Sequence, residues 1–60
     1  MRIINTVTND TIAEIITNRS MTVEEALDLV GTRVERVYDD DPDYVVDGRE
    51  VWAEECDIQY

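Results

Sequence analysis

The chain has 60 residues and a formal net charge of −10, because fifteen carboxylates face only five arginines and there is no histidine. A domain of this size buries only about 60% of the surface that its unfolded chain exposes, so its stability is marginal and a partner chain would add to it. The negative field repels phosphate backbones and anionic membrane surfaces, and we expect neither nucleic acid nor membrane as a direct ligand.

The first half of the chain has the apolar spacing of helices. Residues 1–7 are short, apolar and partly β-branched, and we expect an edge strand or an arm laid on a neighbour. In residues 9–18, Ile12, Ile15 and Ile16 recur at i, i+3 and i+4, which places them on one helical stripe. Polar N-cap candidates precede this stripe, and the sequence therefore predicts a first short helix here.

A second helix is predicted over residues 22–31. Thr22 and Glu25 have the spacing of a capping box, and Gly31 stands where a helix commonly ends in the left-handed conformation. Apolar residues follow the cap at i, i+3, i+4 and i+7: Val23, Ala26, Leu27 and Val30. The connection at residues 19–21 is short, which predicts that the two helices pack against each other.

The sequence of residues 32–38 is compatible with either a strand or a helix. The segment is rich in β-branched residues, and Gly31 costs a continuing helix about 1 kcal/mol relative to alanine, which favours a strand. Val34 and Val37 nevertheless continue the helical spacing of Val30. The alternative is therefore one helix over residues 23–38 and an all-α fold.

The end of the chain predicts strands. Asp47 and Gly48 lie between two β-prone runs, which is typical of a two-residue hairpin turn. Residues 53–55 indicate one helical turn, and a short strand at Ile58 and Tyr60 follows. We expect a single α+β domain over residues 1–60, in which two short N-terminal helices (residues 1–31) pack on a small antiparallel hairpin or meander in the acidic half (residues 32–60).

The acidic residues of this second half have the spacing of a calcium-binding loop. Counted from Asp39, the carboxylates fall at positions 1, 3, 5, 9 and 12 of a twelve-residue loop: Asp39, Asp41, Asp43, Asp47 and Glu50. Tyr44 occupies the position that requires glycine, and Pro42 stiffens the loop. The competing interpretation is a solvated acidic loop that leads into the hairpin, with Pro42 marking the functional point.

Nothing in the sequence indicates catalysis. Without histidine there is no catalytic triad, and there is no Gly-rich phosphate loop and no Cys/His zinc pattern. Cys56 is the only cysteine, so no disulfide forms within the chain, and its acidic neighbours raise the pKa of its thiol. We expect a non-enzyme of the reducing cytoplasm, without a cofactor other than calcium at the acidic loop.

The leading functional hypothesis is a small acidic binding or regulatory protein that presents its negative face to a basic protein partner. Residues 31–60 carry −7 of the net charge, together with every aromatic side chain. We expect the partner surface to include acids and aromatics of this half: Tyr38, Tyr44, Trp52, Glu54 and Glu55.

A more pointed version of this hypothesis is mimicry of nucleic acid. The alternatives are a module that binds divalent cations and a structural subunit without independent activity. The expected helix pair offers more apolar stripe than one copy covers, which also predicts a homodimer.

Overall fold

The computed structural model describes residues 1–60 and confirms the α+β fold class. The elements follow one another along the chain as β1 (Arg2–Asn5), β2 (Thr11–Glu14), α1 (Val23–Val30), β3 (Thr32–Arg33), β4 (Tyr44–Val46), β5 (Arg49–Val51), the 3-10 turn η1 (Ala53–Glu55) and β6 (Cys56–Gln59). The expected arrangement of two helices on one hairpin is wrong, because the structure has a single α-helix and two sheets.

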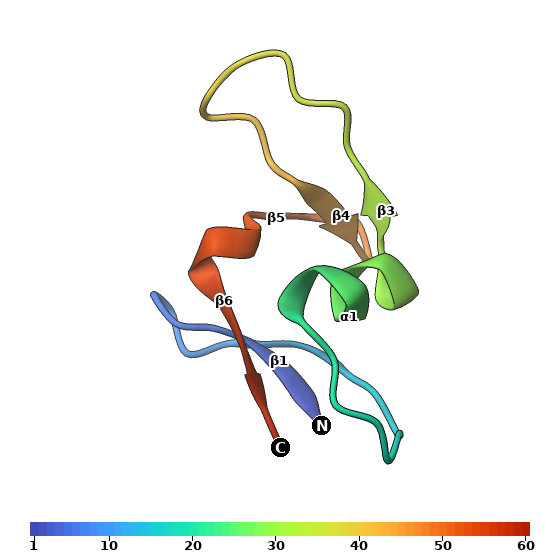
Figure 1. Ribbon diagram of the computed structural model, residues 1–60. Coiled ribbons are helices and arrows are strands. Elements are labelled where there is room, and N and C mark those ends of the chain that lie inside the picture. The colour runs from blue at the N-terminus through green and yellow to red at the C-terminus, as the bar shows by residue number, and fades with distance from the viewer.

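The strands form two antiparallel sheets of three strands each. The β1 sheet has the order β2-β1-β6, and the β4 sheet has the order β3-β4-β5. Arg2 lies opposite Gln59, so the first and last strands of the chain are neighbours (Figure 1). The expected strand at residues 1–7 is therefore present, but β1 is the central strand of its sheet and not an edge strand.

The helix predicted over residues 9–18 is wrong. Asn5 accepts hydrogen bonds from Val7 N and Thr8 N through its side chain, at 2.8 and 3.2 Å, and Asn9 has a φ of 65°. These polar residues make the turn between β1 and β2, because the side chains that cap helices also stabilise turns. Ile12 and Ile15 pack against the core while Ile16 is fully exposed, so the three isoleucines do not form one buried stripe.

The second predicted helix is confirmed as α1. Thr22 Oγ1 accepts from Glu25 N at 3.2 Å and Glu25 Oε1 accepts from Thr22 N at 3.2 Å, which completes the capping box. The helix ends at Val30, so the alternative of one helix over residues 23–38 is wrong. The strand expected over residues 32–38 is limited to β3. The structure contains no helix with the length and apolar character of a membrane span.

Gly31 ends the helix for a reason other than the expected one. Its φ of −137° and ψ of −174° are extended values that any residue adopts, so no left-handed conformation is needed. A Cβ at this position would instead lie 2.6 Å from Val46 Cγ2 and 2.7 Å from the carbonyl oxygen of Val45. Glycine therefore allows the end of α1 to approach β4 more closely than a side chain permits.

The hairpin predicted at Asp47 and Gly48 is confirmed. These residues have φ angles of 55° and 79°, and the type I′ turn requires positive values at both positions. Val46 and Arg49 pair on either side of the turn. The helical turn expected at residues 53–55 is η1, and the final strand is β6.

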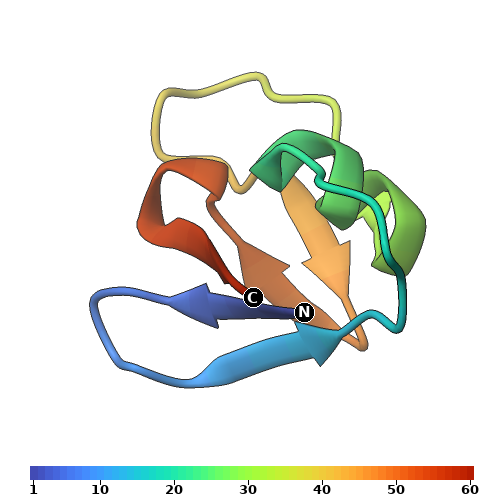
Figure 2. The same ribbon diagram turned by 60° about the horizontal axis from the view of Figure 1, so that its bottom comes forward.

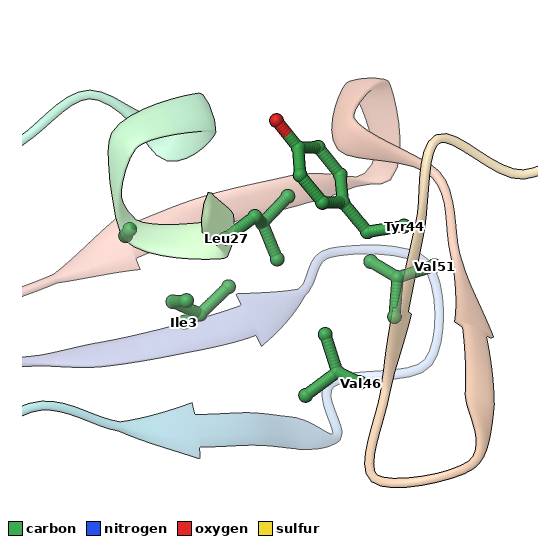
Figure 3. Packing of buried hydrophobic residues seen from close by; sticks show 6 residues of the cluster. Ile3, Leu27, Tyr44, Val46 and Val51 are labelled. Carbon is green, nitrogen blue, oxygen red and sulfur yellow. The ribbon is translucent and has the colours of Figure 1, made fainter. Parts of the chain in front are cut away.

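The core joins the two sheets under the helix. Six apolar side chains form one buried cluster: Ile3, Ala26, Leu27, Tyr44, Val46 and Val51 (Figure 3). Ile3 belongs to β1, two residues belong to α1, and the others belong to β4 and β5. In the turned view of Figure 2, the β1–β2 hairpin lies in front of the β4–β5 hairpin and α1 runs beside them, in contact with β1 and β4.

Replacement of Gly31 by alanine tests the close approach of α1 and β4. Because the backbone carbonyl of Val45 lies in the way, we expect Gly31→Ala to destabilise the protein by about 1–3 kcal/mol, as overpacked sites do. Urea denaturation measures this loss. The neighbouring Thr32→Ala is the matched control, because Thr32 is exposed and its loss changes the stability by less than about 0.5 kcal/mol. Equal stability of the two variants contradicts the contact.

Candidate functional site

The longest segment without a helix or strand is the acidic loop, which we define as residues 34–43 between β3 and β4. It projects from one end of the molecule, away from the two chain ends (Figure 1). Its charged residues are five acids and one arginine: Glu35, Arg36, Asp39, Asp40, Asp41 and Asp43. The loop expected around Pro42 is therefore present, although Pro42 itself is buried.

The base of the acidic loop is fixed to the β4 sheet by three hydrogen bonds around Asp43. The backbone N–H of Val34 donates to Asp43 O at 2.9 Å, and Asp43 N donates to Val51 O at 2.9 Å. The carboxylate of Asp43 also accepts from Ala53 N at 2.9 Å. Asp43 thus connects the loop to β5 and to η1.

The tip of the acidic loop is organised by Asp41. Its Oδ2 accepts from the backbone N–H groups of Val37 and Tyr38, both at 2.9 Å, and its own N–H donates to Tyr38 O at 3.1 Å. The hydrogen bonds from Tyr38 and Val37 hold the pKa of the Asp41 carboxyl below its usual value, because they stabilise the charged form. The carboxylate therefore acts as a structural acceptor that shapes the tip.

Two side chains brace the middle of the acidic loop. Arg36 forms an ion pair with Asp43, with Nη1 3.1 Å from Oδ1, and its Nη2 donates to the carbonyl oxygen of Asp39. The indole Nε1 of Trp52 donates to the carbonyl oxygen of Asp40 at 3.1 Å. The loop is thus held at its base, middle and tip by backbone and side-chain hydrogen bonds together.

This braced loop displays two large apolar side chains to solvent. Val37 is 75% exposed and Tyr38 is 71% exposed, and the backbone N–H groups of both donate to Asp41. Asp39 and Asp40, which follow in the chain, are exposed as well. The tip therefore combines an apolar pair with carboxylates in a fixed backbone conformation.

Few of the carboxylates are neutralised within the molecule. Ion pairs with arginine involve two of the fifteen acids, in the pairs Arg33–Asp28 at 3.2 Å and Arg36–Asp43 at 3.1 Å. The hydrogen bond and the charge of Asp28 raise the pKa of the Arg33 guanidinium. Both pairs lie at the surface, where such contacts contribute little to stability. The remaining carboxylates leave a strong negative field around the protein.

The expected partner surface is brought together only in part. The assignment of Tyr44 to the surface is wrong, because the residue is 3% exposed in the core and burial raises the pKa of its hydroxyl. Trp52 is half-buried and supports the acidic loop, while Tyr38 is exposed on the loop. Glu54 is exposed and Glu55 half-buried on η1.

The carboxylates with calcium-loop spacing are not gathered around one point. No three Asp, Glu, Cys or His side chains in the structure lie close enough to hold a metal ion. Asp41 is occupied by backbone N–H groups and Asp43 by Arg36 and η1, while Asp47 lies in the hairpin turn and Glu50 on β5. The cation hypothesis stays a prediction, and calorimetry with calcium tests it directly.

Cys56 has the unreactive character that its acidic neighbours predict. Burial raises the pKa of its thiol, and the charges of Glu55 and Asp43 raise the pKa further. The Sγ atom donates to Trp52 O at 3.4 Å. The raised pKa keeps this thiol protonated at neutral pH, which is the opposite of what a cysteine nucleophile needs.

The sequence did not indicate the role of Val37. The β-branched residues of segment 32–38 predict Val37 in a strand, and its spacing from Val30 predicts it in a helix, whereas the structure places it on the tip of the acidic loop. A signal was available, because aspartate side chains can hydrogen-bond to the backbone three or four residues before them, and Asp41 follows Val37 by four positions. Because the acids have the spacing of calcium ligands, the sequence suggested a cation ligand at Asp41 and not an acceptor for backbone N–H groups.

Comparison of the chain with family models, with curated proteins and with solved structures gives no match.

Removal of the Asp41 side chain tests the organisation of the acidic loop. In Asp41→Ala the backbone N–H groups of Val37 and Tyr38 lose their acceptor, so we expect their hydrogen exchange to become several-fold faster. The amide of Val46 in the core should exchange as in the wild type. Asp40→Ala is the matched control, because it removes the same charge while the carbonyl that binds Trp52 remains.

Acidification gives a second readout of the same contact. A folded-state pKa below the ordinary value of 3.8 means that the stabilisation by Asp41 is present above this value and is lost as the pH falls through the lowered pKa. The amide chemical shifts of Val37 and Tyr38 should therefore titrate together with a midpoint below 3.8. A midpoint at or above this value, or equal exchange in the two variants, contradicts the assignment.

Proposed function

We propose that this protein is a non-catalytic binding module that docks its acidic loop on a basic surface of another protein. The observation that carries the proposal is the braced tip of the loop, where Val37 and Tyr38 are exposed beside the carboxylates of Asp39 and Asp40. Tyrosine is enriched among the residues that dominate binding energy, and exposed apolar groups surrounded by polar ones mark interaction sites.

The hydrogen bonds of the loop support this function through preorganisation. Association orders the side chains and loops that enter an interface, and this ordering opposes binding. Asp41, Arg36 and Trp52 already fix the backbone that carries Tyr38, so less ordering remains for the bound state. A long loop with this many contacts is therefore suited to recognition.

The electrostatic field supports the choice of a basic partner. A net charge of −10 with few internal ion pairs attracts positive surfaces over a distance and speeds their encounter with the loop. A phosphate-binding groove of a nucleic-acid-binding protein is one surface of this kind, and mimicry of nucleic acid is then a special case of the same docking. Competition by DNA distinguishes that case.

Site-specific cross-linking identifies the partner and tests the loop. A photo-reactive amino acid at position 38 should cross-link to a protein with a basic surface. The same group at position 7 is the matched control, because Val7 is 72% exposed and lies in the turn between β1 and β2. Equal cross-linking from the two positions contradicts docking through the acidic loop.

Calorimetry with the purified partner then measures the energetics. We expect Tyr38→Ala to weaken binding by about 2 kcal/mol or more, as interface anchors do, while Val7→Ala has no effect. The affinity of the wild type should fall as the salt concentration rises, because screening weakens attraction between opposite charges. Binding that is indifferent to salt and to Tyr38 contradicts the proposal.

A further inference from the structure

A second exposed apolar region lies at the other end of the molecule from the acidic loop. It is a shallow hollow of about 330 Å³ beside β1, β2 and β6, and its walls include Ile15, Ile16 and Tyr60. Ile16 is 103% exposed and Tyr60 is 76% exposed. The chain itself does not cover these side chains, although Ile15 packs partly against the core.

The charged side chains around this hollow balance each other, unlike those of the rest of the molecule. Of the fifteen acids only Glu14 lines it, together with one arginine, Arg2. The two residues lie opposite each other on neighbouring strands, yet neither forms an ion pair within the chain. Arg2 donates instead to the neutral side chain of Gln59, with Nη2 2.7 Å from Oε1. The hollow thus presents one arginine and one glutamate side chain without an ion pair, and the N-terminal ammonium of Met1 beside them donates to Ile15 O at 2.8 Å.

We infer that a second copy of this chain covers the hollow in a twofold dimer. Two copies with a net charge of −10 repel each other, and they approach at least cost through a face whose charged side chains balance. A twofold axis brings the same patch of both copies together, so that Arg2 of one copy faces Glu14 of the other and each pair occurs twice. Ile16 is buried against the apolar wall of the partner copy.

The dimer face is independent of the acidic loop, and its response to salt is the opposite. Added salt screens the long-range repulsion between the two copies, whereas the short pairs across the dimer face are screened much less. The dimer should therefore become tighter when the salt concentration rises from about 0.1 M, where the Debye length is about 10 Å, towards about 1 M, where it is about 3 Å. Binding of a basic partner by the loop becomes weaker under the same change.

Sedimentation equilibrium of the 60-residue chain tests the dimer. Over micromolar to millimolar concentrations we expect a monomer–dimer equilibrium whose dissociation constant falls by about tenfold across that salt range. Ile16→Ser should raise the dissociation constant by about tenfold or more, because the dimer loses the burial of two isoleucine side chains. Val7→Ser removes an apolar side chain that is 72% exposed in the β1–β2 turn and should leave the constant unchanged.

Charge exchange tests the register of the two copies. Arg2→Glu and Glu14→Arg each place like charges face to face twice, so each should raise the dissociation constant by about tenfold. The double variant Arg2→Glu/Glu14→Arg restores opposite charges and should restore the dimer, which a general loss of folding does not do. Circular dichroism checks that each variant is folded.

Three results overturn the inference. The first is a wild type that stays monomeric at millimolar concentration and high salt. The second is an Ile16→Ser variant that dimerises as tightly as Val7→Ser, and the third is a double exchange that fails to restore the dimer. Tyr38→Ala should dimerise as the wild type does. A dimer that survives Tyr38→Ala while partner binding is lost separates this inference from the function proposed for the acidic loop.

Discussion

The structure depends on the six buried side chains that hold its two sheets together beneath α1. Each sheet has only three strands, and so small a sheet needs a packed apolar face to be stable in water. Ile3 from β1 and Leu27 from α1 are completely buried with the side chains of β4 and β5. The close approach that Gly31 permits brings α1 near enough to β4 for this cluster to be continuous.

The acidic loop gains its order from the same core. It leaves and re-enters the molecule beside β4, where Tyr44 is buried, and it is attached to β5 and η1 through Asp43. A surface loop of this length would otherwise pay a large entropic cost on binding. The hollow at Ile16 lies on the other side of the core. The buried cluster therefore separates the two exposed apolar regions.

The sequence predicted the elements whose signals are contained within a few residues. The capping box of Thr22 and Glu25 and the turn at Asp47 and Gly48 both depend on bonds or backbone angles within four positions. The helix prediction for residues 9–18 was wrong because Asn and Thr stabilise turns as well as helix starts. Only the pairing of this segment with β1 decides between the two structures.

The candidate site depends on contacts between residues that are far apart in the sequence, and no local sequence pattern shows such contacts. The burial of Tyr44, the approach of Gly31 to Val46 and the support of the loop by Trp52 all join residues from different elements. Charge and composition did locate most of the carboxylates and all four aromatic side chains in the second half of the chain. They did not distinguish the aromatic side chains that build the core from Tyr38, which is exposed.

The pairing of β1 with β6 has a consequence for how the molecule folds. Arg2 and Gln59 are joined by a hydrogen bond across 57 positions, and β1 is the central strand of its sheet. Contacts so distant in sequence close a large loop and slow the search for the native state. While the ribosome is still making residues 56–59, β1 can pair only with β2, so its other edge stays open to non-native pairing until β6 emerges.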